Sequence, residues 1–111
     1  MKIQSRDIGN VAVLTVEGSL LQEDTDDFLS VLVNANNKGT VNIVIDFSDC
    51  SYITSSILSA LFQYKKIFMA LGGNIKVASI NAITKDLFER TNLNQVLDIF
   101  QSVDSAVASF Q

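Results

Sequence analysis

Residues 41–56, VNIVIDFSDCSYITSS, join a nearly continuous apolar run to a cluster of hydroxyl side chains. A short apolar run such as 41–47 is typical of a strand that is buried on both faces of an α/β sheet. The hydroxyl cluster stands in front of a long helical pattern that stops at Gly72-Gly73. The segment therefore predicts a buried strand, a polar turn and a helix in succession.

Strand and helix patterns alternate on both sides of this segment, in steps of roughly 30 residues, the length of one strand–helix–strand unit. Gly9 and Asn10 separate the first two β-rich runs, which favours a hairpin and so one antiparallel edge strand. We expect a single-domain α/β fold over residues 1–111, with a mixed, mostly parallel sheet of four to five strands and about four helices. The other expected strands are 2–6, 11–17, 74–80 and 96–100.

Helix signals fill the gaps between these strands. The acidic run EDTDD (23–27) faces the positive end of a helix dipole, and Gly39 lies where a helix C-terminal glycine belongs. Asn81 predicts the cap of a helix that carries Ile83, Leu87 and Phe88, and Ser102 or Asp104 the cap of a last helix. The long helix is expected to bury a stripe of Ile57, Leu61, Tyr64, Phe68 and Leu71, with Leu58, Phe62 and Met69 beside it and Lys65-Lys66 solvated.

Composition and charge argue against several classes of partner. The chain has 48% hydrophobic residues, enough for a folded core, and a net charge of −4. Its eight Lys and Arg residues are spread along the chain, so we expect no nucleic-acid partner. Met1 is followed by a polar-alternating segment rather than an apolar leader, and no apolar run reaches the ~20 residues that span a bilayer. We therefore expect a cytoplasmic protein without direct membrane insertion.

The lack of histidine removes much side-chain chemistry. Without histidine, Ser-His-Asp catalysis, Cys-His catalysis and imidazole metal ligation are impossible within one chain. The one cysteine, Cys50, is interpreted as a small buried thiol. The acidic run 23–27 lacks the alternate-residue ligands and central glycine of a calcium loop. We expect no metal, no cofactor and no enzymatic activity.

The hydroxyl cluster has two physical interpretations. In the first, Thr54, Ser55 or Ser51 accepts hydrogen bonds from the free N–H groups of the following helix, which is worth about 1 kcal/mol. In the second, a serine in the first helical turn is phosphorylated, because those N–H groups and the helix dipole stabilise a phosphate. Phosphorylation would leave the fold intact and place a dianion where an apolar partner docks. The residues alone leave both interpretations open.

Three stretches resemble the STAS domain, as found in bacterial anti-sigma factor antagonists. VAVLTVEGSL (11–20) is similar to the family's second strand, and VNIVIDFSDCSYITSS (41–56) to its third strand and the Asp-Ser-Ser/Thr-Gly motif that follows. Residues 68–107, FMALGGNIKVASINAITKDLFERTNLNQVLDIFQSVDSAV, resemble its C-terminal half. The likeness extends over almost the whole chain, and the order and spacing of the three stretches imply a STAS-like fold.

The resemblance implies phosphorylation at Ser55, which matches the serine after the motif aspartate, with Ser56 and Thr54 as alternatives. In the family, an anti-sigma factor that is also a serine kinase phosphorylates this serine. The unphosphorylated protein binds that partner and frees the sigma factor, and a serine phosphatase resets the cycle. The same two partners are therefore expected here. The expected partner-binding residues are Leu21, Ser51, Tyr52, Thr54, Ser55, Ser56, Ile57 and Leu58.

Three positions depart from the family pattern. Thr54 stands in place of the motif aspartate, Ile57 in place of the glycine, and Leu21 in place of another aspartate. An alternative function therefore stays open, in which an unphosphorylated STAS accessory subunit docks on a transporter ATPase or another partner complex. Apolar Ile57 and Leu58 would suit such a constant interface. The sequence names no individual partner or regulated process and does not set the oligomeric state.

Overall fold

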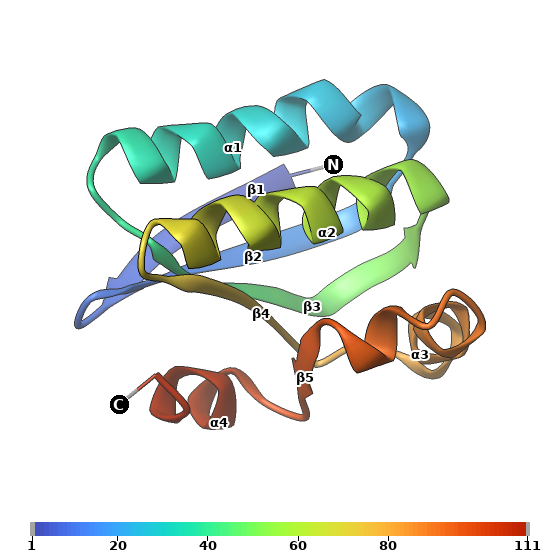
Figure 1. Cartoon of the computed structure of the whole chain (residues 1–111). Coiled ribbons are helices and arrows are strands. Elements are labelled where there is room, and N and C mark those ends of the chain that lie inside the picture. Colours follow the sequence, from blue (N-terminus) through green and yellow to red (C-terminus); the bar gives the residue numbers. More distant parts are fainter. Residues whose placement is uncertain (1, 111) are drawn as a thin grey trace.

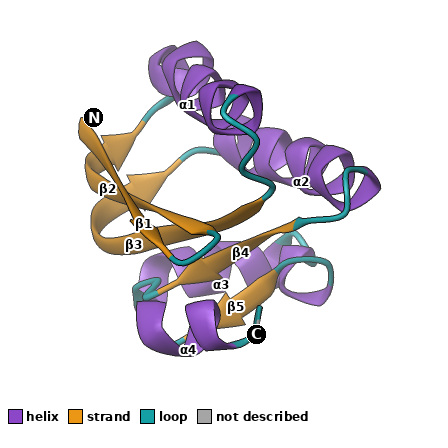
Figure 2. Cartoon of the chain, turned by 90° about the vertical axis from the view of Figure 1, so that its left-hand side faces the viewer, coloured by secondary structure: helices purple, strands orange, loops and turns teal. Residues whose placement is uncertain are grey.

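The fold is a mixed sheet between two layers of helices, and a computed structural model describes residues 2–110 of it. In the sheet order β1-β2-β3-β4-β5, the first pair is antiparallel and the other three pairs are parallel. Figures 1 and 2 show α1 and α2 on one side of the sheet and α3 and α4 on the other. The elements are β1 (Lys2–Ile8), β2 (Val11–Leu20), α1 (Thr25–Asn37), β3 (Asn42–Ile53), α2 (Ser55–Ala70), β4 (Asn74–Ala78), α3 (Ala82–Arg90), β5 (Asp98–Phe100) and α4 (Val103–Ala108), with 3₁₀ turns at Gln22–Asp24 and Leu93–Gln95.

This architecture confirms the predicted fold class, the opening hairpin and the alternation of strands with helices. Three of the predicted helix ends are confirmed as well. Asn81 Oδ1 accepts a hydrogen bond from Thr84 N at 2.8 Å, and Ser102 Oγ accepts one from Ser105 N at 3.1 Å. Gly39, two residues beyond the end of α1, has a φ of +88°, the left-handed conformation that glycine adopts most readily after a helix.

Two apolar clusters lie on the two faces of the sheet. Ile43 and Ile45 of β3 join the larger cluster, which includes Phe28 of α1 and Phe68 of α2. Val44, between them, points to the opposite face and joins a smaller cluster that α4 completes with Ala106 and Val107. Because successive side chains of a strand point to opposite faces, the continuous apolar run of β3 reflects burial on both.

The length of β3 differs from the prediction. The apolar run predicts a strand over 41–47, yet β3 continues to Ile53 and β2 continues past Gly18 to Leu20. The two strands stay paired through Gly18↔Cys50 and Leu20↔Ile53, with register shifts that absorb extra residues. Gly18 has a φ of +86°, which fits such an irregularity. The first part of the hydroxyl cluster therefore belongs to a strand rather than to a turn.

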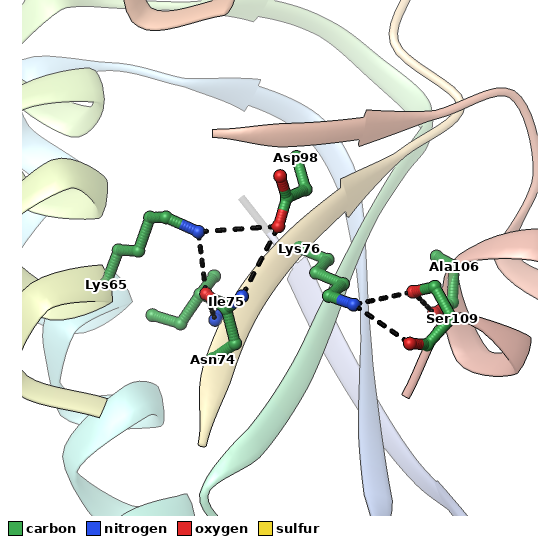
Figure 3. A network of polar contacts seen from close by, with 7 residues as sticks. All are labelled: Lys65, Asn74, Ile75, Lys76, Asp98, Ala106 and Ser109. Atoms are coloured by element: carbon green, nitrogen blue, oxygen red, sulfur yellow. Dashed lines mark hydrogen bonds and ion pairs between the residues drawn. The ribbon is translucent and has the colours of Figure 1, made fainter. Parts of the chain in front are cut away.

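Lys65 is buried, so its predicted place on a solvated helix face is wrong. The residue is 8% exposed, and its ammonium donates to Asn74 Oδ1 at 2.7 Å. The same ammonium lies 3.6 Å from Asp98 Oδ2, to which the Asn74 amide also donates. Figure 3 shows this network joining α2 to β4 and β5. Lys65 follows buried Leu61 by one helical turn, and these polar partners offset the cost of its burial. Lys66 is exposed, as predicted.

A second lysine contacts the residues that directly follow the C-terminal helix α4. Lys76 of β4 is 9% exposed and donates to Ser109 Oγ at 2.7 Å and to Ser109 O at 3.3 Å (Figure 3). Its ammonium also lies 4.2 Å from the centre of the Phe110 ring, close enough for a cation–π attraction. The chain end after α4 is thereby held against the sheet.

Three apolar side chains of the helical patterns are exposed: Leu71 of the stripe expected in the long helix, Met69 beside that stripe, and Ile83 of α3. Met69 is 54%, Leu71 51% and Ile83 66% exposed. Met69 follows buried Phe68 by one residue, a step of about 100° around the helix that turns it outward. Leu71 lies one residue beyond the end of α2, and Ile83 occupies the outer side of the first turn of α3.

We predict that Gly73→Ala destabilises the protein by at least about 2 kcal/mol, because overpacking against a backbone atom cannot relax cheaply. A Cβ at Gly73 would overlap the carbonyl oxygen of Val41, which accepts a hydrogen bond from Asn74 N at 3.0 Å. Urea unfolding would measure the change. Gly9→Ala is the control, since its Cβ would meet open space and the cost is the positive φ alone, about 1 kcal/mol. Equal losses for the two variants would contradict the close approach at Gly73.

Candidate functional site

The candidate site lies where β2 and β3 end and α2 begins. Thr54 N donates to Leu20 O at 3.0 Å, so the chain passes from β3 into α2 while still joined to β2. The hydroxyl oxygens of Ser19 and Ser51 lie 2.9 Å apart across the two strands. The carboxyl ends of parallel strands and the helix N-termini that follow them are the usual place for ligands and partners in α/β folds.

The start of α2 has no side-chain cap among residues 2–110, which contradicts the capping interpretation. Thr54 occupies the N-cap position with extended backbone, but its Oγ1 is buried and has no hydrogen-bond partner within the described residues. Ser51 lies in β3, where its hydroxyl pairs with Ser19 instead. Ser55 is already the first helical residue, so it lies past the cap position.

Ser55 presents its side chain to solvent at the first position of α2, and Ser56 behind it is half-buried. The first turn carries no acidic residue, unlike that of α1, which has Asp26 and Asp27. The backbone N–H groups of a first helical turn have no intrahelical acceptor, and the helix dipole adds positive potential there. An anion at Ser55 would therefore meet a favourable electrostatic environment.

Ile57 and Leu58 lie in the core, at 0% and 1% exposure, so they do not form the surface that was expected to bind a partner. Both side chains join the larger apolar cluster, because the second and third positions after Ser55 turn back toward the sheet. Leu21 and Tyr52 are the exposed apolar residues among those expected at the interface, at 40% and 48%.

Two hollows lie beside the start of α2. One, of about 190 Å³, is bounded by Tyr52 of β3 and by Ile83, Leu87 and Arg90 of α3. The other, of about 320 Å³, begins at Ser55 and lies between α2 and the residues that follow α3. Its lining residues are Ser55, Leu58, Ser59, Phe62, Gln63, Thr91 and Leu93.

The sequence-based expectations name no residue of α3 as part of the site. The sequence pattern assigns Ile83 and Leu87 to the helix that Asn81 caps and gives them no role at a surface. Exposed Ile83, two residues after the Asn81 cap, is the signal that marks this surface, but it becomes visible only once α3 lies beside Tyr52. A larger hollow of about 660 Å³ lies away from this site, along β5.

The contacts of Cys50 and Asp46 are those of residues that support the fold. Burial raises the pKa of the Cys50 thiol, while hydrogen bonds with the backbone of Tyr52 and Leu20 act in the opposite direction. At 4% exposure it is the buried thiol that was predicted. Asp46 Oδ1 accepts a hydrogen bond from Ser48 N at 3.0 Å, so this carboxylate pairs with the neighbouring backbone. Residues 2–110 contain no cluster of three potential metal ligands. None of their helices is long and apolar enough to cross a membrane.

The model of the STAS domain family matches residues 2–106. The chain belongs to the STAS domain family. Searched against curated proteins, its sequence finds no match.

Solved structures share the fold of this STAS chain. A candidate anti-sigma factor antagonist from Thermotoga maritima has a TM-score of 0.90 and 22% identity over 96% of this chain and 92% of its own. An anti-sigma factor antagonist from Mycobacterium paratuberculosis has a TM-score of 0.87 and 18% identity, over 97% and 92%. The Bacillus cell fate determinant SpoIIAA in its phosphorylated form has a TM-score of 0.76 and 14% identity, over 99% and 100%. At these identities the likeness establishes the fold.

We predict that Thr54→Val changes the free energy of unfolding by less than about 0.5 kcal/mol, or stabilises the protein slightly, because the lost hydroxyl makes no hydrogen bond. Ser102→Ala removes a formed cap from α4 and should cost about 1 kcal/mol. Urea unfolding of both variants measures the two effects. A loss in Thr54→Val as large as that in Ser102→Ala would mean that the Thr54 hydroxyl does cap α2.

Proposed function

We propose that this STAS chain is an anti-sigma factor antagonist-like interaction module that binds a serine-kinase anti-sigma factor and is switched by phosphorylation at Ser55. The observation that carries the proposal is the exposed Ser55 hydroxyl at the first position of α2, in a helical turn that has neither a side-chain cap nor a carboxylate. Within residues 2–110, this turn is ready to accept a dianion without loss of an existing bond to the Ser55 side chain.

Phosphorylation of Ser55 would leave the fold intact. A phosphate on Ser55 lies on the solvent side of α2, while Ile57 and Leu58 hold the same turn to the core. Phosphate adds about −1.5 to −2 charges, which the helix dipole and free N–H groups stabilise. The fold likeness to SpoIIAA, a protein solved in a phosphorylated form, supports a scaffold that tolerates such a group.

The surface around Ser55 suits a protein partner. Exposed Tyr52 bounds the first hollow, Ser55 lines the second, and Leu21 is a further exposed apolar side chain at the end of the β2–β3 ladder. An apolar partner surface that covers Ser55 in the unmodified protein would have to desolvate the phosphate of the modified one, at a large cost in free energy. Phosphorylation would therefore release the partner. The module acts as a binding protein in the cytoplasm, and a serine phosphatase returns it to the binding state.

Incubation with ATP and the serine-kinase anti-sigma factors of the same genome should add one phosphate to the chain, and Ser55→Ala should abolish the addition. Ser59→Ala is the matched control, because Ser59 is also exposed and lies one turn further along α2. Intact-mass measurement reads the modification. A kinase that binds the chain but phosphorylates Ser59, or no residue, would contradict the proposed switch.

Ser55→Asp should abolish kinase binding while it stabilises the fold by about 0.5–1 kcal/mol, because a carboxylate in the first helical turn meets the positive end of the dipole. Titration calorimetry and urea unfolding measure the two effects, and Ser59→Asp serves as the control. Unchanged binding by Ser55→Asp, together with capture of a transporter ATPase, would favour the accessory-subunit alternative.

A further inference from the structure

Asn81 joins α3 to the end of β3 through the two ends of one amide group. Its Oδ1 accepts the hydrogen bond from Thr84 N that caps α3, at 2.8 Å. Its Nδ2 donates to the backbone oxygen of Cys50 at 3.3 Å and to that of Ser51 at 3.4 Å. An amide offers an acceptor and two donors on one short side chain, whereas serine or aspartate would supply the cap without this pair of N–H donors.

The two peptide oxygens that Asn81 holds lie directly upstream of the candidate site. Ser51 stands four positions before Ser55 in the sequence, and Tyr52, which follows it, bounds the smaller hollow. The opposite wall of that hollow comes from α3, which Asn81 caps. One side chain therefore forms hydrogen bonds on both sides of this hollow.

The attachment of α3 to the rest of the domain is otherwise light. Of its nine residues, Thr84 and Phe88 are the buried ones. The connections on either side each contain a residue in the left-handed conformation, Ser79 with a φ of +62° and Asn92 with a φ of +60°. Such conformations of non-glycine residues cost about 1–3 kcal/mol and persist only where the surroundings enforce them. Because α3 buries two side chains and α2 buries six, α3 can shift more easily than α2.

We infer that Asn81 is a positioning residue that couples α3 to the turn carrying Ser55, so that a partner seated against α3 and a charge placed on Ser55 act on the same element. The role in regulation rests on the proposed function, but the coupling itself belongs to the free protein. Asn81 is exposed to solvent, so each of its bonds is worth only about 0.5–1.5 kcal/mol net. Bonds of that strength can break and re-form as a partner binds. Because coupling between two sites is reciprocal, a charge on Ser55 would change the affinity of a partner for α3 by the same free energy by which that partner changes the cost of the charge.

The test compares amide NMR spectra of four proteins: the wild type, Ser55→Asp, Asn81→Ser and the double variant. Asn81→Ser keeps a cap acceptor for Thr84 N but loses the donors to Cys50 and Ser51. We expect Ser55→Asp to shift the amide signals of α3 in the wild-type background and to leave them nearly unshifted in the Asn81→Ser background. We also expect α3 amides to exchange with solvent about tenfold faster in Asn81→Ser, while α1 amides stay unchanged.

Asn94→Ser is the matched control, because it makes the same chemical change at an exposed asparagine whose side chain forms no hydrogen bond with residues 2–110. It should leave both the α3 shifts and their exchange as in the wild type. Equal α3 shifts from Ser55→Asp with and without Asn81→Ser would overturn the inference, as would no shift in either background. These readouts need no kinase, so a chain that no kinase phosphorylates would remove the proposed function and still leave the coupling measurable.

Discussion

The parallel pairing of β2 with β3 is the constraint on which the site depends. The ladder runs from Val11↔Asn42 to Leu20↔Ile53, and Thr54 N adds one further bond to Leu20 O. No loop therefore separates the strand from α2, and the first helical residue is fixed relative to the sheet. Leu20 and Ile53 are both buried at the end of this ladder. The place of Ser55 on the surface thus follows from the strand pairing and the core rather than from the hydroxyl cluster itself.

The same constraint divides the hydroxyl side chains among different surroundings. Ser51 lies in a strand and pairs across to Ser19, while Thr54 turns its hydroxyl inward at the junction. Ser55 and Ser59 point to solvent from successive turns of α2. Hydroxyl residues that are close together in the sequence therefore lie in different surroundings. The reason is that the side-chain period changes from two residues in the strand to 3.6 in the helix between Ile53 and Ser55.

More of the fold than of the site could be predicted from the sequence. Strand and helix periods, the hairpin at Gly9 and the caps at Asn81 and Ser102 all depend on local physics, and each is confirmed. The extension of β3 to Ile53 was not predictable in the same way, because it depends on register shifts against β2. The burial of Lys65 likewise depends on Asn74, nine residues away in a different element.

The site also depends on contacts between elements that are distant in sequence. Ile83 belongs to an apolar helical pattern, and its exposure follows from its place on the outer side of the first turn of α3. Ile57 stands where the family pattern has glycine, and it was expected to lie at a partner interface. Its burial at 0% shows that the larger side chain fills the core and leaves the surface beside Ser55 unobstructed.

The replacement of the motif aspartate by Thr54 then has an electrostatic meaning. With an aspartate at the cap, a phosphate on the next residue would bring two anions together, and like charges at that distance repel. In this chain the first turn of α2 carries no carboxylate, so the free N–H groups and the dipole would act on the phosphate alone. The turn would change from no charge to nearly two negative charges, rather than from one to about three. Loss of the aspartate therefore removes a charge that a partner could recognise, and it would also remove the repulsion that a phosphate on Ser55 would meet, while the change in charge on phosphorylation would stay the same.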